Sequence, residues 1–165
     1  MSITTAPAWR HLLNSALVLL IAGAGYAIGQ QDRGTAPVRR VIQPAGYRPS
    51  PAPLVPAILV GDTLYLSGST GGDPNTGQLV PGGMEAELKQ IMANLTTVLA
   101  AANMTMGDVV AVTAYLADMN DYARFNELYR GYFPNAAYPT RSTVAVKDLA
   151  RGARIELTMT AVRSR

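Results

Sequence analysis

The chain has 165 residues, of which 48% are hydrophobic and 15% charged, so it can form a packed core and is not disordered as a whole. It contains no Cys and a single His, which excludes disulfides, thiol nucleophiles, thiolate or His-built metal centres and a Ser-His-Asp triad. The net charge of +3 comes from scattered basic residues without a basic cluster interleaved with aromatics, so we expect no nucleic-acid partner.

Residues 1–29 differ in character from the rest of the chain. A short basic head at Arg10 and His11 is followed by an uncharged run from Leu12 to Ile28. This pattern is typical of a cleaved signal peptide, or of an uncleaved anchor that meets the membrane through residues 12–28. A buried core helix is the third interpretation. With either of the first two, we expect the domain to be periplasmic or secreted, or anchored with the domain outside the cytoplasm.

The next segments predict a linker, an edge strand and a hairpin. Residues 30–37 are a short polar linker, and "VRRVIQP" could form a first edge strand. "AGYRPSPAPLVP" must be extended or turning, because each Pro lacks an amide donor. "AILVGDTLYLSG" predicts a hairpin that turns at Gly61 and Asp62. "STGGDPNTGQLVPGG" is dense in turn residues and predicts a connecting loop, since it holds no phosphate-binding pattern.

The remainder predicts two helices and three strands. From Met84 to Ala102, apolar residues recur at spacings of three and four, as in an amphipathic helix. Residues 108–118, "DVVAVTAYLAD", are apolar on both faces, as in a central strand. "MNDYARFNELYRGYF" predicts a second helix, capped by Asn120 or Asp121. This helix carries an aromatic stripe, which we interpret as core packing rather than as a ligand-binding site. The stripe consists of Tyr122, Phe125, Tyr129 and Tyr132.

The final strands, "TRSTVAV" and "ARIELTMTAV", complete the order β-β-α-β-α-β-β, which predicts an α+β layer with both helices on one sheet face. If these two strands are neighbours, burial fixes their register parity. Placing Val144 beside Ile155 then puts Arg141 and Glu156 on one polar face. A solvent-exposed face would explain that pair equally well. An uncovered face that meets another subunit would instead let the guanidinium grip a small carboxylate.

Several motifs resemble those of the RidA/YjgF family of reactive-imine deaminases. They are "SG" after the second hairpin strand, "NL" and "VL" in the long helix, "DM", "FNELY" and "YF", then "P-x-R-S" and a late "IE". The resemblance extends from about residue 38 to the C-terminus, so residues 38–165 would form one RidA-like domain. It implies a chorismate-mutase-like fold with a single mixed sheet, and a homotrimer with three sites at the subunit interfaces.

The resemblance also implies an activity and roles for named residues. Active members hydrolyse 2-imino or enamino acids to 2-keto acids and ammonia without a cofactor. By motif, Arg141 matches the arginine that binds the substrate carboxylate, and Glu156 matches the glutamate that positions or activates water. The remaining candidate substrate-binding residues are Gly68, Asn126, Ser142 and Thr143, and no metal site is expected.

The chain departs from the family pattern at two positions. Leu54 stands where catalytic members usually carry a Tyr, and Thr143 stands where a Cys often follows the "RS" motif. The first departure keeps a second hypothesis open: a non-catalytic trimer of the same fold that captures small carboxylates or partner proteins.

Overall fold

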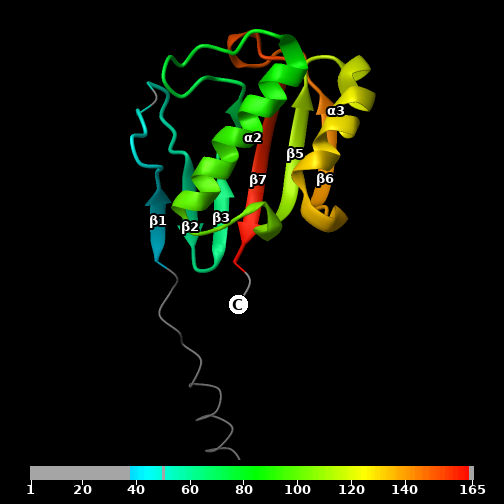
Figure 1. The fold of residues 1–165 in the computed structure, drawn as a ribbon. Helices are drawn as coiled ribbons and strands as arrows, with labels where there is room; N and C mark the ends of the chain where they lie inside the picture. The colour runs from blue at the N-terminus through cyan, green and yellow to red at the C-terminus, as the bar shows by residue number, and fades with distance from the viewer. Residues whose placement is uncertain (1–37, 50, 164–165) are drawn as a thin grey trace, which may run out of the picture. The chain divides into compact units, whose positions relative to one another are not determined.

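The structure is a computed structural model that describes residues 38–49 and 51–163 (Figure 1). These residues belong to the second of the two units into which the chain divides, Val38–Arg165. The expected signal peptide or anchor at residues 1–29 and the linker at 30–37 lie outside the described residues. No helix in the described part of the chain combines the length and the apolar character that crossing a membrane requires.

Within the described residues, seven strands form one mixed sheet in the order β1-β2-β3-β7-β5-β6, with β4 paired to β7. Neighbouring strands are antiparallel except β5 and β6, which run parallel. The strands are β1 (Arg39–Ile42), β2 (Ala57–Val60), β3 (Thr63–Leu66), β4 (Ser69–Thr70), β5 (Val109–Leu116), β6 (Thr140–Ala145) and β7 (Ile155–Val162).

Two α-helices of the described chain, α2 (Gly83–Ala101) and α3 (Tyr122–Tyr129), lie on the same face of the sheet (Figure 1). The predicted α+β fold class is therefore confirmed. Short 3₁₀ turns connect the elements: η1 (Met106–Asp108), η2 (Met119–Asp121), η3 (Arg130–Tyr132), η4 (Pro134–Ala136) and η5 (Ala150–Gly152).

The core lies between α2 and the covered face of the sheet. Along α2, Leu88, Ile91, Leu95 and Leu99 are buried, which confirms the predicted helical stripe. Alternate residues of β7 are buried as well, namely Ile155, Leu157, Met159 and Ala161. The residues between them face away from the helices and are partly exposed. This alternation is expected of a strand that has one face covered.

The predicted cap of the second helix is confirmed in position at Asp121, but its side chain makes no capping hydrogen bond. Asp118 instead accepts a hydrogen bond from the Asn120 amide at 2.9 Å, and so caps the 3₁₀ turn η2 that precedes α3. Of the aromatic stripe, Phe125 and Tyr129 are buried as predicted, whereas Tyr122 is exposed.

The assumption that the last two strands are neighbours is also wrong. β5 lies between β6 and β7, because β6 follows a helical crossover and pairs parallel to β5. Val112 of β5 pairs with Arg141 on one side and with Met159 on the other, so Arg141 points to the helix-covered face. Since Glu156 alternates with the buried residues of β7, it lies on the open face.

The prediction that Arg141 and Glu156 share one face therefore fails. Its premise was that Val144 belongs to the core. In the structure Val144 lies on the open face, in register with Tyr115 and through it with Glu156, and it is 45% exposed. β6 is an edge strand, so an apolar side chain on its open face needs no neighbour within the same chain.

Candidate functional site

The Arg141 guanidinium is held by three side chains of α3. Its central carbon lies 4.7 Å from the ring centroid of Phe125 and 4.6 Å from that of Tyr129. One terminal nitrogen donates a hydrogen bond to the side-chain oxygen of Asn126. Aromatic faces attract cations, so the two rings fix the guanidinium without consuming its N–H donors. No carboxylate in the described residues forms an ion pair with Arg141.

This guanidinium lines a cavity of about 390 Å³. The lining residues are Asn126, Tyr129, Arg130, Tyr138, Pro139 and Arg141. They come from the end of α3, the turn that follows it and the start of β6. The set holds two cations and no acid, which suits an anionic ligand. We call this region the arginine half-site.

Tyr129 brings a buried hydroxyl group to the arginine half-site. Its side chain is only 4% exposed, and its hydroxyl has no hydrogen-bond partner among the described residues. Burial raises the pKa of Tyr129 to about 12, against the lowering effect of the nearby Arg141 charge. The group therefore stays protonated at neutral pH and can donate to a ligand. The Thr143 hydroxyl is likewise buried without a partner in the described chain.

Glu156 lies in a second cavity of about 370 Å³ on the open face, lined by Gly68, Tyr115, Leu149, Glu156 and Thr158. A Cβ atom added to Gly68 would lie 2.0 Å from Oε1 of Glu156. The carboxylate thus rests directly against the Gly68 backbone, and no larger residue permits that position. We call this region the glutamate half-site.

The segment that contains Leu54 runs beside the glutamate half-site. The Ser67 amide donates to the Pro56 carbonyl at 2.9 Å, and the Ser67 hydroxyl donates to the Val55 carbonyl at 2.6 Å. Ser67 directly precedes Gly68, so these bonds place the chain around Leu54 near the carboxylate. The Leu54 side chain itself is 49% exposed and offers no polar group.

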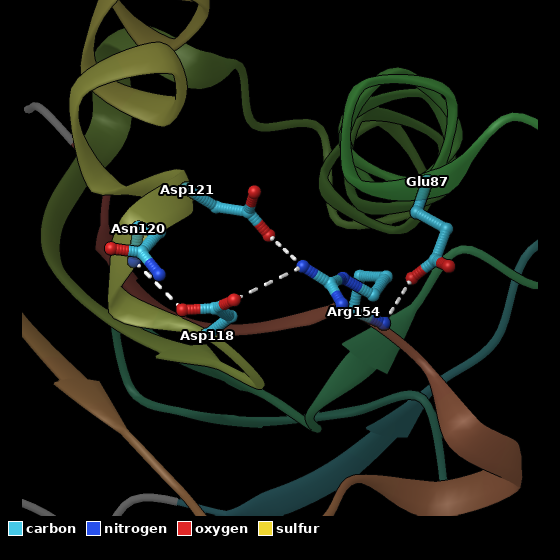
Figure 2. A network of polar contacts seen from close by, with 5 residues as sticks. All are labelled: Glu87, Asp118, Asn120, Asp121 and Arg154. Carbon is cyan, nitrogen blue, oxygen red and sulfur yellow. Dashed lines mark hydrogen bonds and ion pairs between the residues drawn. The ribbon is translucent and has the colours of Figure 1, made fainter.

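A polar network fixes the start of β7, just ahead of Glu156 (Figure 2). Glu87 of α2 is buried and accepts the Arg154 backbone N–H at 2.8 Å. The Arg154 guanidinium donates to Asp121 at 2.7 Å and lies 3.8 Å from Asp118. The hydrogen bond from Arg154 to Asp121 raises the pKa of Arg154. The network joins α2, η2 and β7, so it holds the strand that carries Glu156.

The structure divides the predicted site residues into two groups. Arg141 and Asn126 meet in the arginine half-site, and Thr143 points to the same sheet face. Glu156 and Gly68 meet in the glutamate half-site. Ser142 is exposed on the open face, in register with Thr113 and through it with Thr158. The two half-sites lie on opposite faces of one sheet.

Sequence reasoning missed several lining residues. Tyr129 was visible in the aromatic stripe but was assigned to the core, and it in fact contacts both the core and Arg141. Arg130 and Tyr138 gave no signal, because their place in the cavity depends on the turns after α3. For metals, no cluster of three or more potential ligands occurs among the described residues.

Comparisons with known proteins show which proteins this chain resembles in sequence and fold. Proteins named 2-iminobutanoate/2-iminopropanoate deaminase from Capra hircus and Mus musculus are 41% and 42% identical over 125 residues, covering 76% of this chain and 90% and 92% of theirs. The structure of RidA from Psychrobacter sp. PAMC 21119 matches with a TM-score of 0.70 and 30% identity over 75% of this chain and 99% of that protein. E. coli TdcF with bound serine matches with a TM-score of 0.70 and 29% identity over 76% of this chain and 99% of that one.

The sequence model of the family described as Endoribonuclease L-PSP matches residues 46–163. That range includes every residue of both half-sites. The chain therefore belongs to this family, the RidA/YjgF family whose motifs its sequence carries.

Proposed function

We propose that the protein hydrolyses reactive 2-imino or enamino acids to 2-keto acids and ammonia. The observation that carries the proposal is the Arg141 guanidinium, which is oriented by two rings and an amide yet has no acid partner in the described chain. Such a group binds a carboxylate through two parallel hydrogen bonds. The deaminase names of relatives at about 41% identity support the same reaction for this chain.

The complete site would combine two copies of the chain. Arg141 and Glu156 lie on opposite faces of one sheet, so one chain cannot bring both to the same ligand. If the arginine half-site of one copy meets the glutamate half-site of the next, the interface joins two different surfaces. Interfaces of that kind form a ring when the rotation between successive copies closes, and an open filament when it does not. We therefore propose a homotrimer with three shared sites, and the exposed Tyr65 and Val144 on the open face would be covered by it.

The proposed reaction begins with the substrate carboxylate on Arg141. Glu156 of the neighbouring copy holds a water molecule against the imine carbon and accepts its proton as the C–O bond forms. Starting from the protonated imine, this gives a neutral carbinolamine, and Glu156 returns its proton to the carbinolamine nitrogen. Ammonia then leaves as the C=O bond forms, and the hydroxyl group gives up its proton to the Glu156 carboxylate, from which the departing ammonia takes it as ammonium. An imine is intrinsically electrophilic, so positioning supplies much of the rate. One water is consumed for each ammonia released, and the reaction needs no redox partner.

A second candidate function is capture of small carboxylates without turnover. It is favoured by Leu54, whose segment runs beside the glutamate half-site. Leu54 has an apolar side chain where a Tyr would offer a hydroxyl group. In this alternative the arginine half-site binds its ligand as described, and the carboxylate of Glu156 activates no water.

A coupled assay distinguishes the two functions. An amino-acid oxidase generates the imine, semicarbazide competes for it, and ammonia release is followed with and without the protein. We expect the protein to lower the amount of semicarbazide adduct that forms, because it hydrolyses the imine first. Glu156→Gln should reduce this effect by roughly 10²-fold or more while retaining keto-acid binding, because the amide keeps the shape but not the charge. Keto-acid binding without any turnover by the parent protein would favour the capture function.

A further inference from the structure

We propose that the substrate carries a second carboxylate, in its side chain, and that Arg130 binds it. The protein would then prefer the imines of acidic amino acids over those of small aliphatic ones. This inference rests on the proposed function, because it assumes that Arg141 takes the carboxylate next to the imine. It adds a specificity residue to the arginine half-site.

The first argument is the charge of the cavity. Arg130 and Arg141 both line it, and none of the other lining residues is acidic. No hydrogen bond or ion pair joins the Arg130 side chain to another described residue. By contrast, Arg151 donates to the Thr70 hydroxyl and to the Gly77 carbonyl. Two like charges that line one cavity repel each other, and a ligand with two negative charges would remove that cost.

The second argument concerns the acid best placed to neutralise Arg130. Glu127 lies three residues earlier, at a spacing that allows an ion pair on a helix. Its Oε2 instead contacts Arg124 at 2.6 Å. Arg124 also donates twice to Glu85 of α2, at 2.7 and 3.0 Å. Glu127 is thus paired with Arg124, one turn earlier, and no ion pair joins it to Arg130 in the described chain.

The third argument is that the cavity is built to hold a polar ligand. Tyr129 is only 4% exposed, and its buried hydroxyl has no partner in the described chain. A buried hydroxyl without a partner is costly, so a ligand atom that accepts from it would stabilise the complex. The volume of about 390 Å³ is within the range of small-molecule sites. Arg130 and Arg141 both line this cavity, so a short diacid in it would lie beside both cations.

The test measures binding of two stable keto acids to the full chain by calorimetry. The probes are 2-oxobutanoate, with one carboxylate, and 2-oxoglutarate, with two. We expect the parent protein to bind 2-oxoglutarate about ten-fold more tightly, the scale of one charged hydrogen-bonding contact at an exposed group. Arg130→Gln should remove most of that preference while weakening 2-oxobutanoate binding by no more than about two-fold. Arg130→Lys should keep part of it, since the charge remains.

Lys89→Gln is the matched control, because it removes the same charge from an exposed position of α2 that lines neither cavity. It should leave the preference intact. Equal binding of the two keto acids by the parent, or a preference that survives Arg130→Gln, would overturn the second carboxylate site and leave the deaminase proposal standing. A change of assembly state in Arg130→Gln, seen by sedimentation, would also overturn it by showing that Arg130 serves a subunit contact. If Arg141→Ala leaves binding of both keto acids unchanged, the proposed function fails as well.

Discussion

Replacing Gly68 by Ala should move the Glu156 carboxylate while the fold stays intact. The new methyl group would lie 2.0 Å from Oε1 of Glu156, whereas ordinary contact is about 3.5 Å. The carboxylate must therefore retreat by about 1.5 Å. A misplacement of about 1 Å can cost a catalytic group roughly 10²-fold in rate. We expect a loss of imine hydrolysis on that scale in Gly68→Ala.

The stability of this variant should be close to that of the parent. Gly68 is not among the glycines with positive φ, and the atoms that it would displace belong to the far end of a flexible side chain. Replacing Gly by Ala also lowers the entropy of the unfolded chain, which stabilises by about 0.4–1 kcal/mol at a compatible position. Denaturant unfolding and ammonia release should be measured on the same preparation.

The matched control is Gly107→Ala, whose added Cβ would meet its nearest atom at 3.4 Å and which lines neither cavity. It should retain both activity and stability. Full activity in Gly68→Ala would refute the idea that the contact with Gly68 sets the working position of Glu156. A large loss of stability would show instead that the glycine supports the fold.

Three further predictions concern other residues. Arg141→Lys should lose most keto-acid binding by calorimetry, because an ammonium lacks the planar fork; near-normal affinity would contradict the assigned grip. Tyr129→Phe should unfold at the same or a higher denaturant concentration at pH 7, since it removes a buried hydroxyl without a partner. The parent protein should also lose stability between pH 10 and about 12, because the unfolded chain releases the Tyr129 proton in that range and the folded chain keeps it. Tyr129→Phe should lose less stability over the same range. Equal losses would show that the raised pKa of Tyr129 is not the cause. We also propose that the protein is exported: mass spectrometry of separated cell fractions should find it outside the cytosol, either beginning after residue 29 or partitioning with membranes, and full-length protein in the cytosol would disprove export.

Most of the order of the elements was predictable because most segments have a strong local pattern; the exception is β4, which lies at the start of the stretch predicted to be only a loop. The spacing from Met84 to Ala102 and the turn at Gly61 and Asp62 both act over a few residues, and the structure confirms both. The pairing of β6 was not predictable in the same way. Alternation in "TRSTVAV" fixes which residues share a face but not which face is covered, and that depends on the crossover through α3.

The candidate site shows the same limit. The motifs singled out Arg141, Glu156, Gly68 and Asn126, and the structure places all four at a cavity. What the pattern could not reveal is that they form two separated pairs, because sequence motifs carry no information about sheet faces. Arg130 was invisible for a related reason. A lone arginine at the end of an amphipathic helix looks solvated until the turn that follows is known.

If the copies assemble into the proposed rings, the placement of the two half-sites on opposite faces makes complementation between two inactive chains possible. A chain with Arg141→Ala still offers a complete glutamate half-site, and a chain with Glu156→Gln still offers a complete arginine half-site. When the two inactive chains are unfolded together and refolded as mixed rings, about one interface in four would join two intact halves. A mixture of the two inactive variants would thus regain part of the activity. That activity would fade on dilution below the concentration at which the rings dissociate, while bound substrate, which contacts two chains at once, would oppose that dissociation.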